Sequence, residues 1–288
     1  MSNQRNPWRF TILALAALVA AGCGGGEEAE SEGGATDEAV EPLVDPAQAA
    51  TISGVVNFEG TPPENEPIDM SAEPTCAEKH EGQPRAQTVV VNDGRLANAF
   101  VYVREGLPER TWPVSGEAQT LDQEGCTYEP HVLGVQTGQT LEIRNSDGIL
   151  HNINAAPENQ RGFNISQPTT MTSTREFDEP EVMIPVECDV HGWMRAYIGV
   201  LEHPYFAVTG EDGSFTIANL PPGDYVVEAW HERYGTQTVN VSVQAQGEGQ
   251  ANFTYSAAQA SAHVPLGEPI DLHDHGDRAR TALRTHGG

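Results

Sequence analysis

The sequence predicts an all-β protein built from two β-sandwiches, and two observations lead to this prediction. Beyond residue 50, apolar residues alternate with polar ones in short runs, each bounded by Gly, Pro, Asn or Asp. Short alternating strands separated by turn residues are typical of sandwiches, in which one face of each strand is buried. No helical period of useful length and no internal repeat appears in this region.

The predicted strands can be followed along the chain. The clearest alternating runs are 52–58, 89–91, 100–103, 141–143 and 225–229. Two turn signals lie near the C-terminal end: Asp212-Gly213 lies between two alternating runs and predicts a β-hairpin, and 221–223 (Pro-Pro-Gly) predicts a second turn.

The first residues are expected to export the chain. Arg5 and Arg9 precede an apolar run at 10–21, which is too short for a permanent membrane span, and small residues lead to Cys23. This arrangement resembles the bacterial lipobox and implies that residues 1–22 are a signal peptide and that Cys23 is acylated. Cleavage nearby in an ordinary secreted protein is the alternative. We expect a lipid-anchored protein on the periplasmic or cell-surface side; Gly24, in place of an inner-membrane retention aspartate, favours the outer membrane.

Charge divides the chain further and excludes one class of partner. Residues 23–50 carry eight acidic residues, no basic one and little to bury, so they are predicted to be a disordered tether. Residues 257–288 form a tail that contains His and Asp. The whole chain has 42 acidic against 15 basic residues, a net charge of −27, and its only lysine is Lys79. Nucleic-acid binding needs a basic face for the phosphates, so nucleic acid is excluded as a partner and a basic partner is favoured.

A cluster of metal-binding residue types marks the middle of the chain. Cys188, His191 and Met194 follow one another at Cys-x2-His-x2-Met, and His151 lies upstream after a run ending in Asn145. A thiolate, two imidazoles and a weak thioether are the ligand set that suits copper changing between Cu(I) and Cu(II). Three of these residues share one loop, so only His151 must be brought in by the fold.

These residues resemble the cupredoxin family of blue-copper electron carriers, with an amicyanin-like loop spacing, over about Cys126–Leu201. The resemblance implies a Greek-key sandwich with one type 1 copper ion and no enzymatic activity. His151, Cys188 and His191 would be equatorial ligands, Met194 the axial ligand, and Asn152 the residue that braces the two ligand loops. It also implies that His191 lies at the protein surface and admits electrons. Gly192 and Trp193 would belong to a docking patch for a basic redox protein such as a cytochrome c.

Other interpretations of the same residues remain open. Zinc would use Cys188 with two histidines but leaves Met194 unexplained. A metal-free fold, a nucleophilic Cys188/His151 pair and a purely structural Trp193 are further alternatives.

Cys76 and Cys126 lie outside this cluster. In an oxidising compartment we favour a disulfide between them. The spacings Cys76-x3-His80 and Cys126-x4-His131 leave a second metal site as the alternative.

The C-terminal region, 204–256, resembles the carboxypeptidase-regulatory-like, or carbohydrate-binding-like, domain also found in rhamnogalacturonan lyases, a small Ig/prealbumin-like sandwich. Residues 51–106 resemble the opening strands of that family. We therefore predict that they complete the C-terminal sandwich and that the copper domain, 107–203, is inserted between them. The resemblance implies a fold and no activity. It leaves a second function open, a module that binds a glycan or a protein, with copper structural, stored or absent.

Overall fold

The computed structural model describes residues 44–259. The predicted signal peptide, Cys23, most of the tether and nearly all of the tail lie outside the described residues. Among the described residues the only helix is the four-residue α1, Pro74–Ala77, and all other regular structure is strand, which confirms the predicted all-β class. Within 44–259, no helix is long and apolar enough to cross a membrane.

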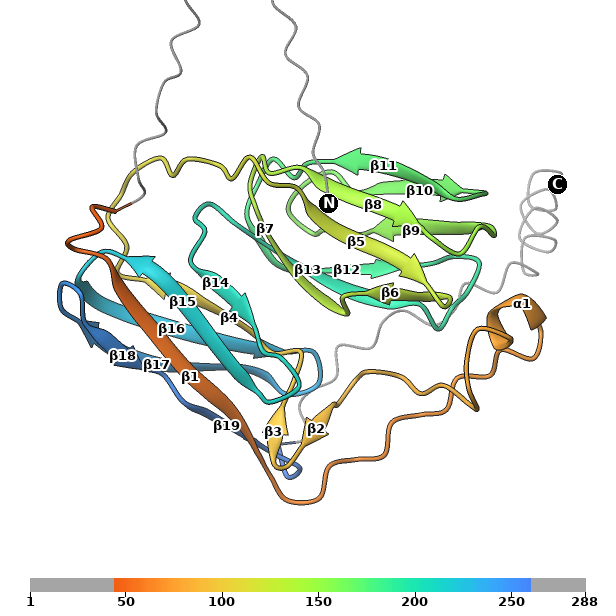
Figure 1. The fold of residues 1–288 in the computed structure, drawn as a ribbon, viewed down its shortest axis with the longest axis horizontal. Helices are drawn as coiled ribbons and strands as arrows, with labels where there is room; N and C mark the ends of the chain where they lie inside the picture. Colours follow the sequence, from red (N-terminus) through yellow and green to blue (C-terminus); the bar gives the residue numbers. More distant parts are fainter. Residues whose placement is uncertain (1–43, 260–288) are drawn as a thin grey trace, which may run out of the picture. The chain divides into compact units, whose positions relative to one another are not determined.

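The first and last parts of the described chain form one sandwich, here called sandwich A (Figure 1). One sheet is built around β1 (Ala50–Glu59) and the other contains β4 (Phe100–Glu105). Strand β1 pairs with β3 (Arg95–Leu96), β15 (Ser214–Leu220), β18 (Glu248–Gln250) and β19 (Phe253–Ser256), and β3 also pairs with β2 (Val91–Asn92). The second sheet has the order β14 (Phe206–Val208), β4, β16 (Gly223–His231), β17 (Gly235–Val243).

The predicted hairpin at Asp212-Gly213 is wrong. This turn joins β14 to β15, but β14 pairs with β4 and β15 pairs with β1, so the turn carries the chain from one sheet to the other. Gly213 has a φ of 67°, and Asp212 accepts a hydrogen bond from the Ser214 N–H at 3.0 Å. The local turn chemistry is therefore present, while strands from the distant N-terminal segment take the pairing partners.

The middle of the chain forms sandwich B (Figure 1). Its two sheets enclose a core that includes Leu121, Ile143, Ile153 and Val186. One sheet has the order β10 (Phe163–Gln167), β9 (His151–Ala155), β12 (Glu181–Glu187), β13 (Arg195–Leu201), β7 (Val132–Gln136). The other has the order β11 (Met171–Arg175), β8 (Leu141–Asn145), β5 (Gln119–Glu124), β6 (Thr127–Glu129). In chain order, all of these strands lie between β4 and β14 of sandwich A.

One segment departs from the predicted division. Residues 60–90, here called the cap, connect β1 to β2; their middle part packs on sandwich B, whereas Val89 near their end is buried in the core of sandwich A. Met70 and Cys76 of the cap are buried in the core of sandwich B, at 3% and 0% exposure. Within 51–106, the middle part of the cap therefore does not belong to sandwich A. Proline and acidic residues give the cap no alternating pattern by which its destination could be recognised.

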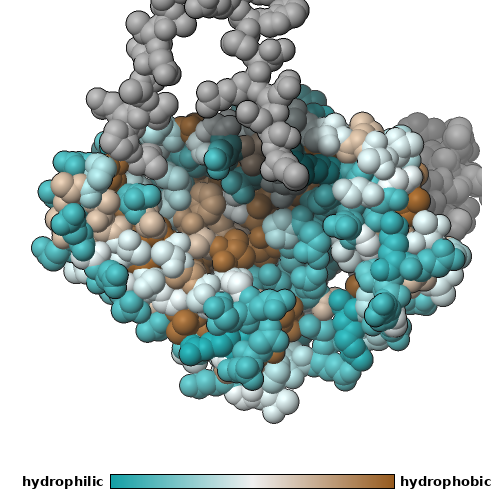
Figure 2. Space-filling view, in the orientation of Figure 1, coloured by the Kyte–Doolittle hydropathy of each residue, from teal (hydrophilic) through white to brown (hydrophobic). Residues whose placement is uncertain are grey.

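A pair of glycines lets the two sandwiches approach closely. Gly134 of β7 and Gly199 of β13 are opposite each other in a parallel pair, and the ring of Phe100 from β4 lies over both. A Cβ on Gly134 would come within 2.3 Å of Phe206 and 2.8 Å of Phe100. Figure 2 shows a mostly hydrophilic face on which apolar residues gather around β14, near this contact.

We expect Gly134→Ala to lower the free energy of unfolding by about 1–3 kcal/mol, because the added methyl group overpacks this contact. Chemical denaturation of the full chain measures it. Gly116→Ala is the matched control, because a Cβ there meets nothing within 4 Å. Equal stability of the two variants would contradict the close approach.

Candidate metal centre

Strand pairing brings the predicted ligands together at one end of sandwich B. Strands β9 and β12 are antiparallel, with Glu187 opposite Asn154, so His151 at the start of β9 lies beside the loop that follows β12. That loop, 188–194, is closed where Glu187 pairs with Arg195. Within it the Cys188 N–H donates to the Met194 carbonyl at 3.3 Å, and the Met194 N–H donates to the His191 carbonyl at 2.9 Å.

Three ligand atoms converge in a buried space. The Nδ1 atoms of His151 and His191 are 2.9 Å apart, and Cys188 Sγ lies 3.8 Å from His191 Nδ1. One ligand atom from each residue lies within 4.8 Å of the others, and none of the three residues is more than 2% exposed. Met194, at 1% exposure, is buried in the same core as Cys188.

The electrostatics of the pocket suit a metal ligand set. Burial would raise the pKa of Cys188, but hydrogen bonds from His151 and from backbone N–H groups outweigh it and lower the pKa, which favours the thiolate. Burial and the neighbouring His151 lower the pKa of His191, which favours the neutral ring. Burial would lower the pKa of His151, but Asp147 and Cys188 raise it to about 8, so a metal that binds there must displace a proton from this ring. A thiolate with neutral imidazoles is the protonation state that metal binding requires. The residues present therefore fit a copper ion.

Asn152 connects the two ligand segments. Its backbone N–H donates to Cys188 Sγ at 3.5 Å, and its side-chain Oδ1 accepts the Asp189 N–H at 2.6 Å. Its Nδ2 donates to Asp189 Oδ2 at 2.9 Å. These contacts hold the start of β9 against the 188–194 loop, the bracing position that the sequence resemblance implies for this residue.

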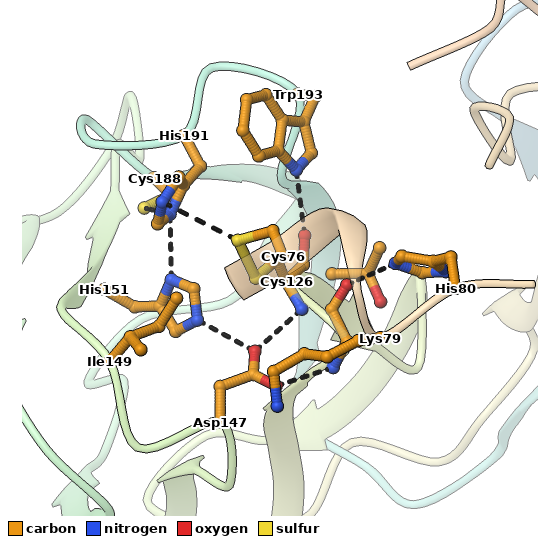
Figure 3. Close-up of a disulfide and its surroundings, with 12 residues drawn as sticks. Cys76, Lys79, His80, Cys126, Asp147, Ile149, His151, Cys188, His191 and Trp193 are labelled. Atoms are coloured by element: carbon orange, nitrogen blue, oxygen red, sulfur yellow. Dashed lines mark hydrogen bonds and ion pairs between the residues drawn. A yellow bond between two sulfur atoms is a disulfide. The ribbon is translucent and has the colours of Figure 1, made fainter. Parts of the chain in front are cut away.

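The expectation that His191 lies at the surface is wrong. His191 is 2% exposed, because the cap covers it: Cys76 Sγ lies 4.0 Å from His191 Nε2 (Figure 3). Trp193 lies on the same side, with its ring centroid 5.1 Å from that of His191, and its indole N–H donates to the Cys126 carbonyl at 2.9 Å. Trp193 is half-buried and Gly192 is exposed, so these two residues carry the loop to the surface.

Cys76 and Cys126 form a disulfide, so neither thiolate is available to a second metal. The two histidines have other partners. His80 Nε2 contacts the Gly125 carbonyl at 2.7 Å, and His131 Nε2 contacts Glu232 of sandwich A at 2.5 Å. The alternative of a second metal site is therefore wrong.

Two residues that the sequence argument did not single out complete the surroundings. Asp147 Oδ2 accepts a hydrogen bond from His151 Nε2 at 2.8 Å, and Lys79 Nζ of the cap lies 3.0 Å from Asp147 Oδ1 (Figure 3). The signals available were weak: Asp147 precedes His151 by four residues, and Lys79 is the only lysine in the chain.

Comparisons with known proteins agree with the two resemblances to different extents. Residues 196–256 match the model of the carboxypeptidase regulatory-like domain, which confirms the resemblance at the C-terminal end. The match begins within β13 of sandwich B and does not include β1–β4, which complete sandwich A. No curated protein matches the chain.

Several solved copper proteins resemble part of the chain. A Cu-containing nitrite reductase from Thermus scotoductus SA-01 is 18% identical with a TM-score of 0.28, covering 33% of this chain and 25% of its own length. A purple cupredoxin from Nitrosopumilus maritimus is 21% identical with a TM-score of 0.25, covering 28% and 98%. An oxidised amicyanin mutant is 20% identical with a TM-score of 0.27, covering 35% and 97%. Because these TM-scores are low, the case for a metal centre rests on the side-chain geometry.

We expect the double variant Cys76→Ala/Cys126→Ala to lose about 2–5 kcal/mol of stability, because the disulfide closes a 50-residue separation. Loosening the cap should also expose His191. Mass spectrometry after treatment of the metal-free protein with diethyl pyrocarbonate measures this as faster modification at His191. His203, whose ring stacks on Tyr205 of sandwich A, is the internal control. An unchanged rate at His191 would show that the cap does not depend on the disulfide.

Proposed function

We propose that the chain is an electron carrier with one type 1 copper ion, held by His151, Cys188 and His191 with Met194 as the axial ligand. The observation that carries the proposal is the convergence of two imidazole Nδ1 atoms and one thiolate sulfur in a space that the protein keeps from solvent. Bound copper supplies one-electron chemistry between Cu(I) and Cu(II).

The residues around the ligands serve such a carrier in two ways. Asn152 and the backbone hydrogen bonds within 188–194 restrict movement of the ligands, which keeps reorganisation small when the charge changes. Burial of all three ligand atoms suits electron exchange, because no substrate atom has to reach them. We therefore favour a carrier over an enzyme.

Electrons would enter beside Trp193 rather than at His191. Gly192 and Trp193 line a pocket of about 370 Å³ that is also bordered by the cap. Glu66 and Asp69 of the cap line it too. The arginines that line it pair with neighbouring acidic residues: Arg85 with Glu64 at 2.8 Å and Arg195 with Glu187 at 3.0 Å. An acidic surface of this kind supports a basic partner such as a cytochrome c, bound weakly and in a salt-dependent manner.

The location of the carrier follows from the sequence alone. A lipid on Cys23 would anchor the chain to a membrane, outer rather than inner, on the periplasmic or cell-surface side, with residues 23–50 as the tether. Separation of the membrane fraction from the soluble fraction, for the native protein with and without its first 23 residues, would test the anchor.

We expect the purified full-length mature chain to bind one Cu(II) and to show an intense visible charge-transfer absorption from the Cys188 sulfur. Cys188→Ser should abolish the colour while the circular dichroism spectrum stays unchanged, because serine replaces the thiol at similar size. His203→Gln, a histidine outside the centre, is the control and should keep the colour. Colour that survives in Cys188→Ser, or a colourless wild type, would contradict the proposal and favour the binding-module alternative.

Met194→Leu is expected to keep the colour and raise the reduction potential, because removing the axial sulfur donor weakens Cu(II) more than Cu(I). Met183→Leu, in strand β12 outside the 188–194 loop, is the matched control. Cyclic voltammetry of both variants measures the effect. A potential that does not move in Met194→Leu would show that Met194 is not the axial ligand.

A further inference from the structure

Four groups from three parts of the chain meet on the Asp147 carboxylate. His151 Nε2 donates to Oδ2 at 2.8 Å, and the Cys126 N–H donates to the same oxygen at 2.7 Å. The Gly125 N–H donates to Oδ1 at 2.8 Å, and Lys79 Nζ lies 3.0 Å from it. The Asp147 side chain is only 1% exposed (Figure 3). A carboxylate with this many donors at a buried position is held in one orientation.

We propose that Asp147 is a positioning residue of the metal centre, which holds His151 with Nδ1 toward the metal while Lys79 and the Gly125–Cys126 turn balance its charge. The inference rests on the proposed function, since it concerns the same ligand set. It adds a charged residue, and through Lys79 the cap, to what sets the properties of the copper site.

The hydrogen bond decides which ring nitrogen can bind a metal. A carboxylate accepts only, so His151 Nε2 must carry the proton, and the lone pair of the neutral ring is then on Nδ1. Nδ1 is the atom that faces His191 Nδ1. A carboxylate on the outer nitrogen of a ligand histidine also makes the ring a stronger donor to the metal.

The charge balance explains how a buried carboxylate is tolerated. Burial would raise the pKa of Asp147, but hydrogen bonds from His151, the Cys126 and Gly125 N–H groups and Lys79 outweigh it, and the pKa lies well below its usual range. Each oxygen of the Asp147 carboxylate faces two donors, so the group acts here only as an acceptor. Removing a partner from a buried ion pair is costly, so Lys79 and Asp147 have to be considered together.

The two ligand histidines are supported unequally. The outer nitrogen of His151 meets a full negative charge, whereas the outer nitrogen of His191 meets a disulfide sulfur at 4.0 Å. Negative charge near the centre favours Cu(II) over Cu(I). Substituting Asp147 removes a negative charge beside the centre, and substituting Lys79 removes a positive charge from the same place. The two substitutions should therefore shift the reduction potential in opposite directions, which a merely structural role of the pair would not predict.

The first test is made on the metal-free full chain and does not require copper. Nitrogen-15 NMR of the His151 ring, recorded over a pH range that includes its neutral form, reports which ring nitrogen carries the proton. We expect Nε2–H in the wild type and a mixture in Asp147→Asn. Protonated Nδ1 on His151 in the wild type would overturn the inference, whatever the protein binds.

The second test uses copper alone as the probe. We expect Asp147→Asn to weaken Cu(II) binding by about 10–100-fold, to weaken Cu(I) binding less and so to raise the reduction potential. Lys79→Gln should lower the potential, because the carboxylate then stays without its counter-charge. Asp122→Asn is the matched control, because Asp122 Oδ2 accepts from Ser146, the neighbour of Asp147, at 2.8 Å, and its Oδ1 accepts from the Gln123 N–H at 2.8 Å.

The outcomes separate the two proposals. A wild type that binds copper but whose potential is the same in Asp147→Asn and Asp122→Asn would overturn the role of Asp147 and leave the electron carrier standing. A wild type with Nε2–H on His151 that binds no copper would support the positioning role and overturn the carrier. Shifts of the same sign in Asp147→Asn and Lys79→Gln would indicate general loosening and also overturn the inference.

Discussion

The metal centre depends on the antiparallel pairing of β9 with β12. The register that sets Asn154 opposite Glu187 fixes where His151 lies relative to the 188–194 loop. A shift of one residue would turn His151 to the opposite face of the sheet and remove it from Cys188. Pairing of β12 with β13 closes the same loop from its other end. The position of every proposed equatorial ligand thus follows from backbone hydrogen bonds within one sheet, and Asn152 ties its two segments together.

The local sequence predicts the ligand set well and the surroundings of the ligands poorly. Three proposed ligands share one short loop, so their spacing alone indicates a metal site, and a preceding strand run indicates His151. The alternating apolar pattern likewise predicts β1, which buries one face, and the continuous apolar run of β4 matches a strand that is buried on both faces. At Asp212-Gly213 the same local logic fails: a turn signal specifies a reversal of the chain but not which strand pairs with which, and β1 takes the partner that a hairpin would have used.

The cap is the part that sequence reasoning could not place, and it changes the site most. Its residues lack a periodic apolar face, so they resemble a connection, although Met70, Cys76 and the partly buried Ile68 pack them on sandwich B. The disulfide partners could be favoured from compartment alone, but not their position beside His191. The role of Asp147 could not be predicted for a similar reason, because a Ser-Asp-Gly turn is common in any β-protein. The Asp147 carboxylate gains its partners only when the cap and the Gly125–Cys126 turn fold over it.

Because the cap covers His191, the metal centre is influenced by two separate sets of charges, one on the protein surface and one next to the ligands. The surface is strongly acidic and acts at long range, where salt screens it. Next to the ligands, the Asp147 charge is matched by Lys79 and shielded from water, so salt screens it far less. A change in ionic strength should therefore alter how fast a basic partner arrives without altering the local charge that favours one copper oxidation state. The cap makes this separation possible, because it supplies Lys79 and also excludes solvent from the imidazole that cupredoxin resemblance alone would leave exposed.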